Sequence, residues 1–405
     1  MAISTSGDTD LDRPVAVHPL TFLDEGDEVT VGRADIDAYC VLPADGAELL
    51  RRLAEGMSPR AAAAWYADNY GEPVDVVEFV EAMRELEFLA EDGKVAVDSG
   101  PVRWQRLGAA VFSPAAWICY GALIVAAVVV SVREPSLAPH YRNLFFTDYM
   151  LVLELGLTLG QLPFIIFHEG AHALAGRRLG LRTKMRIGRR LYFVVVETSL
   201  DGLVTVPRAR RYLPMLAGMF ADVVACAVLT LLAALVRHDG VEPQFGRVCL
   251  ALAFACVLRF VWQFYLYLQT DVYHVISTVL GCVDLQKTAR EMISNRIGRL
   301  FGREPVDETA WHHRDRAVAR WYSWLLFGGY AVLLGTLALV GLPSAIRIFG
   351  TVFGRLVAAD TSGWTEVADS IVFLALTVAQ FAVPAVLALR ERARRKRSKL
   401  THVID

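Results

Sequence analysis

The sequence has almost no net charge and no cysteine spacing typical of a metal site or a disulfide framework. Its 41 lysine and arginine residues nearly balance 43 aspartate and glutamate residues, giving a formal net charge of −2. Domains that bind nucleic acid usually carry a basic excess, so nucleic acid is not an expected partner. The six cysteines include no C-x-x-C pair, and we interpret them as packing thiols rather than disulfide partners or zinc ligands.

The start of the chain lacks the pattern of a secretory signal. The first twenty residues carry Asp8, Asp10 and Asp12 and contain no basic segment followed by an apolar one. A cleaved signal peptide has both features. We therefore expect residues 1–20 to be a disordered lead-in and the N-terminus to lie in the cytoplasm.

Long apolar segments are abundant. Hydrophobic residues make up 55% of the chain, and the mean hydropathy is +0.39. Six segments are long enough to cross a lipid bilayer. They cover residues 109–132, 149–172, 212–236, 248–270, 321–342 and 368–389. The sequence therefore predicts a mainly α-helical polytopic membrane protein with about six transmembrane helices.

Lysine and arginine are distributed unevenly among the connections between these segments. The connections 173–211 and 272–320 and the tail beyond residue 390 are rich in both. The alternate connections near 133–147, 237–247 and 343–366 carry only two such residues each. Basic connections stay on the cytoplasmic side of a membrane, so we expect both termini to be cytoplasmic.

Residues 21–100 have the composition of a small soluble α/β domain of winged-helix type. Strand-like apolar residues come first, and three stretches with helical spacing follow. Ser58 and Pro59 form an N-cap followed by proline at the first helical position, starting a helix that should end by Gly71. The expected elements are strands within 27–42, helices from 46, 59 and 73, and a closing strand at 94–97.

The pentad His168-Glu169-Gly170-Ala171-His172 lies at the end of the second apolar segment. On a helix, positions i and i+4 share a face, so the two imidazoles could bind one Zn²⁺ with Glu169 as general base. Ionisable side chains inside a membrane segment are costly, and such residues usually mark a functional site. The sequence therefore predicts metal-assisted peptide hydrolysis near the cytoplasmic face of the membrane.

A catalytic zinc usually takes a third protein ligand. The candidates are Asp201, Asp222, Asp271 and His274. The expected depth of the side chains favours Asp271, which should end the fourth span. It also places Asp222 close enough to contact the metal ligands without binding the metal itself. His274 could stabilise a developing oxyanion or replace Asp271, although an ordinary interfacial histidine is the simpler interpretation.

Two further charges fall within apolar segments. Glu154 and Arg259 should lie at similar depths on the second and fourth spans. We expect them to form an intramembrane ion pair that holds these helices in register. The alternative is that Glu154 extends to the outer interface.

The basic connection after the second span contains a strand-like stretch at 191–198. We expect its partner to be residues 203–206, joined across Asp201 and Gly202. A hairpin here could present an edge to an extended peptide. An ordinary hairpin without this role is equally compatible with the sequence.

Residues 149–300 resemble the site-2 protease family of intramembrane zinc metalloproteases. The resemblance lies in the pentad at 168–172, in Ala217-Gly218 followed by Asp222, and in Asp271 after an apolar span. It implies that His168, His172 and Asp271 bind zinc and that Glu169 is the base. The late motif of the family usually contains Asn-Pro and a glycine after the aspartate. Here Phe264-Tyr-Leu-Tyr-Leu-Gln-Thr precedes Asp271, and Val272 follows it.

Residues 21–100 also resemble PqqD-like peptide-recognition domains, through Leu49-Leu-Arg-Arg-Leu-Ala-Glu-Gly56 and Met83-Arg-Glu-Leu-Glu-Phe-Leu89. The two resemblances together imply a peptide zinc metalloprotease of a bacterial peptide-maturation system, in the cytoplasmic membrane. The N-terminal domain would bind a leader peptide or a partner protein. The alternatives are a non-catalytic membrane component of a peptide export or immunity system, and regulated intramembrane proteolysis of a membrane-anchored regulator.

The expected organisation follows from these segments. It comprises a lead-in at 1–20, a peptide-binding domain at 21–100, a metalloprotease core at 101–300, additional transmembrane helices at 301–390 and a basic cytoplasmic tail at 391–405.

Overall fold

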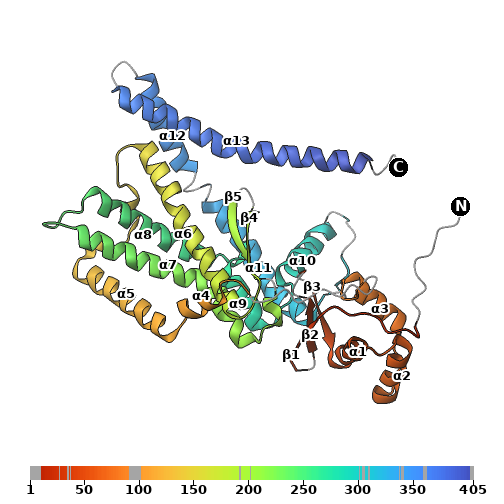
Figure 1. The fold of residues 1–405 in the computed structure, drawn as a ribbon. Helices are drawn as coiled ribbons and strands as arrows, with labels where there is room; N and C mark the ends of the chain where they lie inside the picture. Colours follow the sequence, from red (N-terminus) through yellow and green to blue (C-terminus); the bar gives the residue numbers. More distant parts are fainter. Residues whose placement is uncertain are drawn as a thin grey trace. The chain divides into compact units, whose positions relative to one another are not determined.

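The computed structural model describes residues 11–26, 28–33, 36, 38–90, 102–190, 193–200, 202–300, 302, 306–308, 311–336, 338, 342–358 and 363–401. These residues are mostly helical, with a three-stranded sheet near the N-terminus and a separate two-stranded sheet (Figure 1). The mainly helical fold is therefore confirmed. The chain divides into two compact units: Met1–Ser113, Gly170–Arg186 and Glu197–Ala217 form the first, and Pro114–Glu169, Ile187–Val196 and Gly218–Asp405 form the second.

The first unit contains an antiparallel sheet in the order β1-β2-β3. Its strands are β1 (Thr21–Asp24), β2 (Glu28–Arg33) and β3 (Ala38–Pro43). Val31 of the central strand pairs with Phe22 on one side and Cys40 on the other. Val29 and Val31 are buried, so β2 anchors the sheet to the core of the domain.

Three helices complete this core, namely α1 (Ala44–Ala54), α2 (Pro59–Tyr70) and α3 (Val76–Glu85). Leu49, Leu50 and Leu53 of α1 are fully buried in one cluster with Val80 of α3. The Ser58 hydroxyl caps α2, and Gly71 ends it with a φ of 76°. The start and end predicted for this helix are confirmed, because a capping hydroxyl and a left-handed glycine satisfy backbone groups that the helix leaves without partners.

The expected disordered lead-in is wrong for residues 11–20. Leu11, Val15, Val17 and Leu20 pack against the core of the domain. The backbone pairs with the segment after α3, since the Ala90 N–H donates to the Ala16 carbonyl. The apolar residues of this stretch are interspersed with polar ones, and they bury their side chains against a core that exists only in the folded domain. Residues 1–10 and the predicted strand at 94–97 lie outside the described residues.

Four helices of the described chain are long and apolar enough to cross a membrane. They are α5 (Pro114–Arg133), α6 (Met150–Arg178), α7 (Arg208–Val236) and α8 (Gln244–Trp262). They correspond to the first four predicted spans. The fifth and sixth predicted spans overlap α11 (His313–Thr336) and α13 (Trp364–Thr401), which are not among the four, and α12 (Leu342–Val357) lies between them.

Helices α7 and α8 pack closely through small side chains. Ala225 and Ala233 of α7 are buried in one cluster with Cys249, Ala253 and Cys256 of α8. Small residues let two helix backbones approach, which favours association between helices in an apolar environment. This contact fixes the relative position of the two helices that carry Asp222 and Arg259.

The fourth predicted span ends earlier than expected. Helix α8 stops at Trp262, a short 3-10 turn η5 (Leu266–Leu268) follows, and α9 (Asp271–Leu280) begins at Asp271. Gln269 has a φ of 54°, which no continuous helix allows. Asp271 therefore begins a helix instead of ending one. Helix α10 (Leu285–Leu300) then packs against α11 around Tyr322 and Leu326.

The predicted hairpin has a different partner strand. Its strands are β4 (Lys184–Arg190) and β5 (Phe193–Ser199). The expected partner, residues 203–206, forms the 3-10 turn η4 (Leu203–Thr205) after Gly202 with a φ of 86°. The strand expected at 191–198 is thus present as β5, and its pairing with 203–206 is wrong.

Candidate metal centre

Helix α6 presents both histidines of the pentad on one face. It is continuous from Met150 to Arg178, although Pro163 interrupts its hydrogen bonds. His168 and His172 are buried, with 4% and 6% of their surface exposed. The boundary between the two units falls inside this helix, after Glu169. The two imidazoles still lie one turn apart, because the geometry of the continuous helix sets their spacing.

His168 lies between two carboxylates of the second unit. Its Nδ1 is 2.9 Å from Oδ2 of Asp222, and its Nε2 is 3.3 Å from Oδ2 of Asp271. An ionised carboxylate only accepts hydrogen bonds, so Nδ1 donates its proton to Asp222. A neutral imidazole then carries its lone pair on Nε2, on the side of Asp271.

His172 is oriented in the same way within the first unit. Its Nδ1 is 2.7 Å from the carbonyl oxygen of Pro214 in α7. A carbonyl also only accepts, so Nδ1 donates and the neutral ring carries its lone pair on Nε2. Metal-binding histidines commonly donate the other ring N–H to a carboxylate or a carbonyl, which fixes the tautomer. Both histidines have this arrangement.

His168 and Asp271, both in the second unit, have the donor chemistry of a zinc site. His172 follows His168 by one turn of α6, so the helix itself brings a second imidazole next to the first. Two atoms bound to one zinc at about 2.0–2.1 Å and at the tetrahedral angle would be about 3.3–3.4 Å apart. The 3.3 Å between His168 Nε2 and Asp271 Oδ2 matches this separation. The residues present therefore fit Zn²⁺.

The break after α8 brings Asp271 to this position. Oε1 of Gln263 accepts the Asp271 backbone N–H at 3.1 Å, and the Thr270 hydroxyl donates to the Gln263 carbonyl. Gln263 and Thr270 are both buried. Two bonds to one residue thus close the loop 263–271.

Asp222 is the most buried carboxylate next to the pentad, with 2% of its surface exposed. Its Oδ1 accepts from Nε and Nη2 of Arg259 at 2.8 and 2.6 Å. The expected Glu154–Arg259 pair is therefore wrong. Oε1 of Glu154 instead accepts from Nε2 of Gln380 at 2.6 Å. Similar depth on two helices did not determine the pairing, because α7 packs against α8 and offers Arg259 a closer carboxylate.

The remaining predicted residues have different surroundings. Glu169 is half-buried beside His168 on α6. His274 is exposed, and its ring contacts that of Tyr273 at 5.2 Å between centroids. Asp201 lies outside the described residues. The structure gives His274 the ordinary surroundings of a surface side chain.

Sequence reasoning missed three residues that shape the centre. The Pro214 carbonyl orients His172, and Gln263 and Thr270 place Asp271. A backbone carbonyl has no signature in sequence. The polar pair Gln263 and Thr270, in a segment interpreted as the apolar end of a span, was an available signal of a break.

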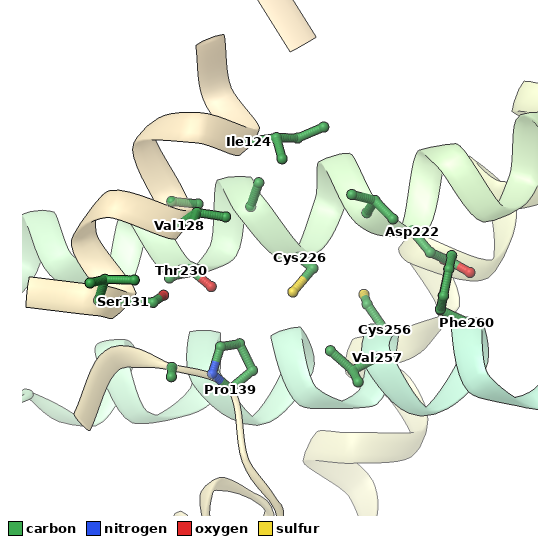
Figure 2. A pocket seen from close by; sticks show the side chains of 15 residues that line it. Ile124, Val128, Ser131, Pro139, Asp222, Cys226, Thr230, Cys256, Val257 and Phe260 are labelled. Carbon is green, nitrogen blue, oxygen red and sulfur yellow. The ribbon is translucent and has the colours of Figure 1, made fainter. Parts of the chain in front are cut away.

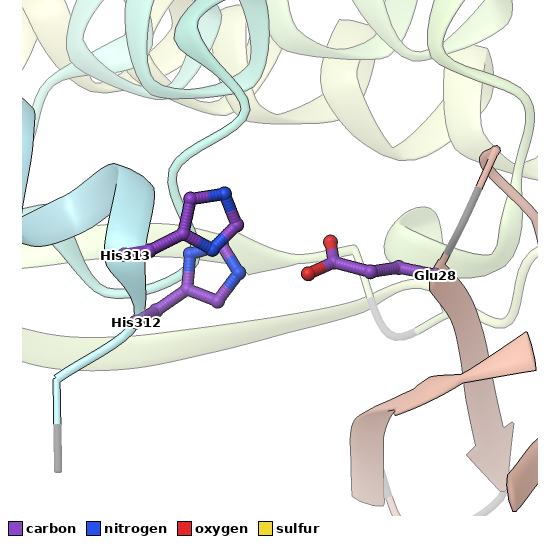
Figure 3. Close-up of side chains that lie close together, drawn as sticks. All are labelled: Glu28, His312 and His313. Carbon is purple, nitrogen blue, oxygen red and sulfur yellow. The ribbon is translucent and has the colours of Figure 1, made fainter.

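A second group of histidines lies at the start of α11. The rings of His312 and His313 lie with their centroids 4.5 Å apart and their planes tilted by 45° (Figure 3). Glu28, drawn in the same figure, belongs to the first unit, whereas the histidines belong to the second. Two adjacent histidines do not by themselves make a metal site, and the candidate centre remains the one on α6.

Comparison of the chain with protein-family models, with curated proteins and with solved structures found no match in any of the three.

Proposed function

We propose that this protein is a zinc metalloendopeptidase that hydrolyses a peptide bond near the cytoplasmic face of a membrane. The observation that carries the proposal is the orientation of His168 and His172. Each ring donates Nδ1–H to a fixed acceptor and carries its lone pair on Nε2, and Asp271 supplies a carboxylate. Glu169 supports catalysis, because a purely structural site has no use for an additional carboxylate beside the metal.

In the proposed mechanism, His168, His172 and Asp271 would hold the Zn²⁺. When bound, zinc supplies a Lewis acid that polarises the scissile carbonyl and favours loss of a proton from water. A carboxylate oxygen of Glu169 accepts the proton of the attacking water and returns it to the leaving amide nitrogen. One C–O bond forms, the C–N bond breaks, and one water molecule is consumed. Asp222 keeps His168 in the required tautomer, and Arg259 balances the charge of Asp222.

The N-terminal domain is proposed to bind a peptide, either the leader of a ribosomally made substrate or a segment of a partner protein. Its support is an antiparallel sheet whose outer strands β1 and β3 each have one side not paired within that sheet. Such an edge can accept an extended peptide by strand addition. The substrate would then be a peptide, or a membrane protein, with one segment held by this domain.

The proposed location is the cytoplasmic membrane of a bacterium, with both termini inside. Its support is the four apolar helices together with the basic residues that follow α6. The end of α6 that bears His168 and His172 leads directly into this basic connection. Water and substrate would therefore reach the centre from the cytoplasmic side.

The metal content of the purified protein tests the proposal. Elemental analysis should find one zinc per chain in the wild type and in Glu169→Gln, and none in His168→Ala or Asp271→Ala. His274→Ala is the matched control, because His274 is an exposed residue of the same helix as Asp271 and should keep the metal. A wild type without zinc, or zinc that does not depend on Asp271, would favour a non-catalytic component of peptide export or immunity.

A further inference from the structure

The second unit contains a cavity of about 480 Å³ between α5, α7, α8 and the stretch 138–139 (Figure 2). Its wall is mainly apolar carbon, from side chains such as those of Ile124, Val128 and Val257. Ser131 and Thr230 lie at one end, and Asp222 and Phe260 lie at the other (Figure 2). This volume is in the usual range for the binding sites of small molecules.

The cavity runs along α7 from near the end of the span to the depth of the metal centre. Residues 222 and 230 both line it, and eight residues of helix cover about 12 Å. Ser131 is two residues before the end of α5, so this end lies close to the membrane surface. A ligand could therefore enter at the surface and extend into the apolar interior.

The charge in the wall of the cavity is already balanced within the protein. Asp222 is its only ionisable carboxylate, and its two oxygens are engaged by His168 and Arg259. The thiols of Cys226 and Cys256 also face the cavity (Figure 2). An occupant consequently needs no charged group within the cavity, and a charged group would lack a partner there.

The chemistry of the wall does not suit an extended peptide. An extended peptide would fit, but its amide groups need hydrogen-bond partners. Apart from residues 138–139, the wall belongs to helices whose backbone groups bond within the helix. A hydrocarbon chain needs no such partners.

We propose that this cavity holds one hydrocarbon chain of a membrane lipid, which enters beside Ser131 and Thr230 and reaches toward Asp222. The headgroup would remain at the membrane surface, near the connection that follows α5. The hydrocarbon chain would fill the part of the cavity next to Asp222 and keep water away from the Asp222–Arg259 pair. The proposal depends on the membrane position of the four helices and not on the metal chemistry, so each can fail separately.

Photolabelling of the full-length protein in phosphatidylcholine nanodiscs tests this proposal. The probe is phosphatidylcholine with a diazirine near the methyl end of one acyl chain, and mass spectrometry locates the labelled side chains. In the wild type, Cys226 and Val257 should be labelled more strongly than Val125, an exposed side chain of α5. Equal or weaker labelling of the cavity residues would overturn the proposal.

A pair of neighbouring alanines provides the matched variants. Ala127 is buried and lines the cavity, whereas Ala126 is exposed and does not. Labelling of Cys226 should be lost in Ala127→Phe, because the ring fills the cavity, and retained in Ala126→Phe. The same loss in both variants, or in neither, would contradict the proposal. If Ala127→Phe fails to fold, the wild-type comparison decides alone.

Discussion

Arg259 binds Asp222 through two nitrogens on a single carboxylate oxygen, and the other oxygen of Asp222 is thereby left to orient His168. The three residues come from α8, α7 and α6. A carboxylate buried among apolar helices would be costly without a cation beside it. Arg259 thus has a positioning role, because the charge it balances is the charge that fixes the histidine tautomer.

Loss of Arg259 should weaken both the fold and the metal site. Arg259→Leu leaves Asp222 without its cation, and breaking a buried pair from one side costs about 3–5 kcal/mol of stability. Zinc affinity should fall about 10–100-fold, which is the usual effect of removing a residue that helps to orient a metal ligand. Chelator competition and thermal unfolding in detergent measure the two effects. Arg247→Leu, at an exposed position of the same helix, should change neither.

Substitution of Glu154 separates the observed pairing from the expected one. Glu154→Gln should keep wild-type zinc affinity, because Glu154 bonds to Gln380 and not to Arg259. Asp222→Asn should lower zinc affinity about 10–100-fold, because the amide no longer fixes the His168 tautomer as a carboxylate does. The same chelator titration measures both variants. A large loss in Glu154→Gln with none in Asp222→Asn would contradict the observed network.

Removing the side-chain acceptor of Gln263 should release the loop that carries Asp271. Gln263→Leu deletes the bond to the Asp271 N–H, and a net loss of about 1 kcal/mol corresponds to roughly fivefold weaker zinc binding. Gln244→Leu is the control, because it deletes one side-chain bond at the other end of α8, to the Phe146 carbonyl. Equal zinc affinity in the two variants would show that the loop does not depend on Gln263.

The first unit contains an ion-pair cluster that holds the N-terminal domain to the start of α7. Glu25 accepts from Arg208 and Arg211 at 2.9–3.0 Å, and Arg211 is buried. Glu25→Gln should therefore speed hydrogen exchange of residues 203–211, measured by mass spectrometry. Asp24→Asn should not, because the exposed Asp24–Arg51 pair contributes little and involves neither of these arginines. Unchanged exchange in Glu25→Gln would refute this docking role.

The hydrogen bond from Tyr66 to Asp45 should make the N-terminal domain sensitive to pH at both extremes. The bond lowers the pKa of the Asp45 carboxyl, so its contribution to stability is lost as pH falls through the folded-state pKa. The same bond raises the pKa of Tyr66 to about 12, so stability also declines once pH exceeds the ordinary tyrosine value. Tyr66→Phe should raise the Asp45 pKa in NMR titrations, whereas Tyr70→Phe, at an exposed position, should leave it unchanged.

Local features of the fold followed from the sequence. The cap at Ser58 and the end of α2 at Gly71 depend on residues next to the helix. The four helices long and apolar enough to cross a membrane follow from runs of apolar side chains. The pairing of His168 with His172 follows from helical periodicity alone. Each of these features depends on interactions within a few residues, and a linear pattern records such interactions.

Tertiary structure decided what depends on contacts between distant segments. Arg259 pairs with Asp222 because α7 and α8 pack through small residues, whereas depth alone suggested Glu154. Asp271 reaches His168 because Gln263 closes a loop where the sequence suggested continuous helix. The sequence by itself determined which side chains could bind a metal. Only the folding of distant segments against one another determined which of them meet, because buried charges and backbone groups take the nearest partner that packing provides.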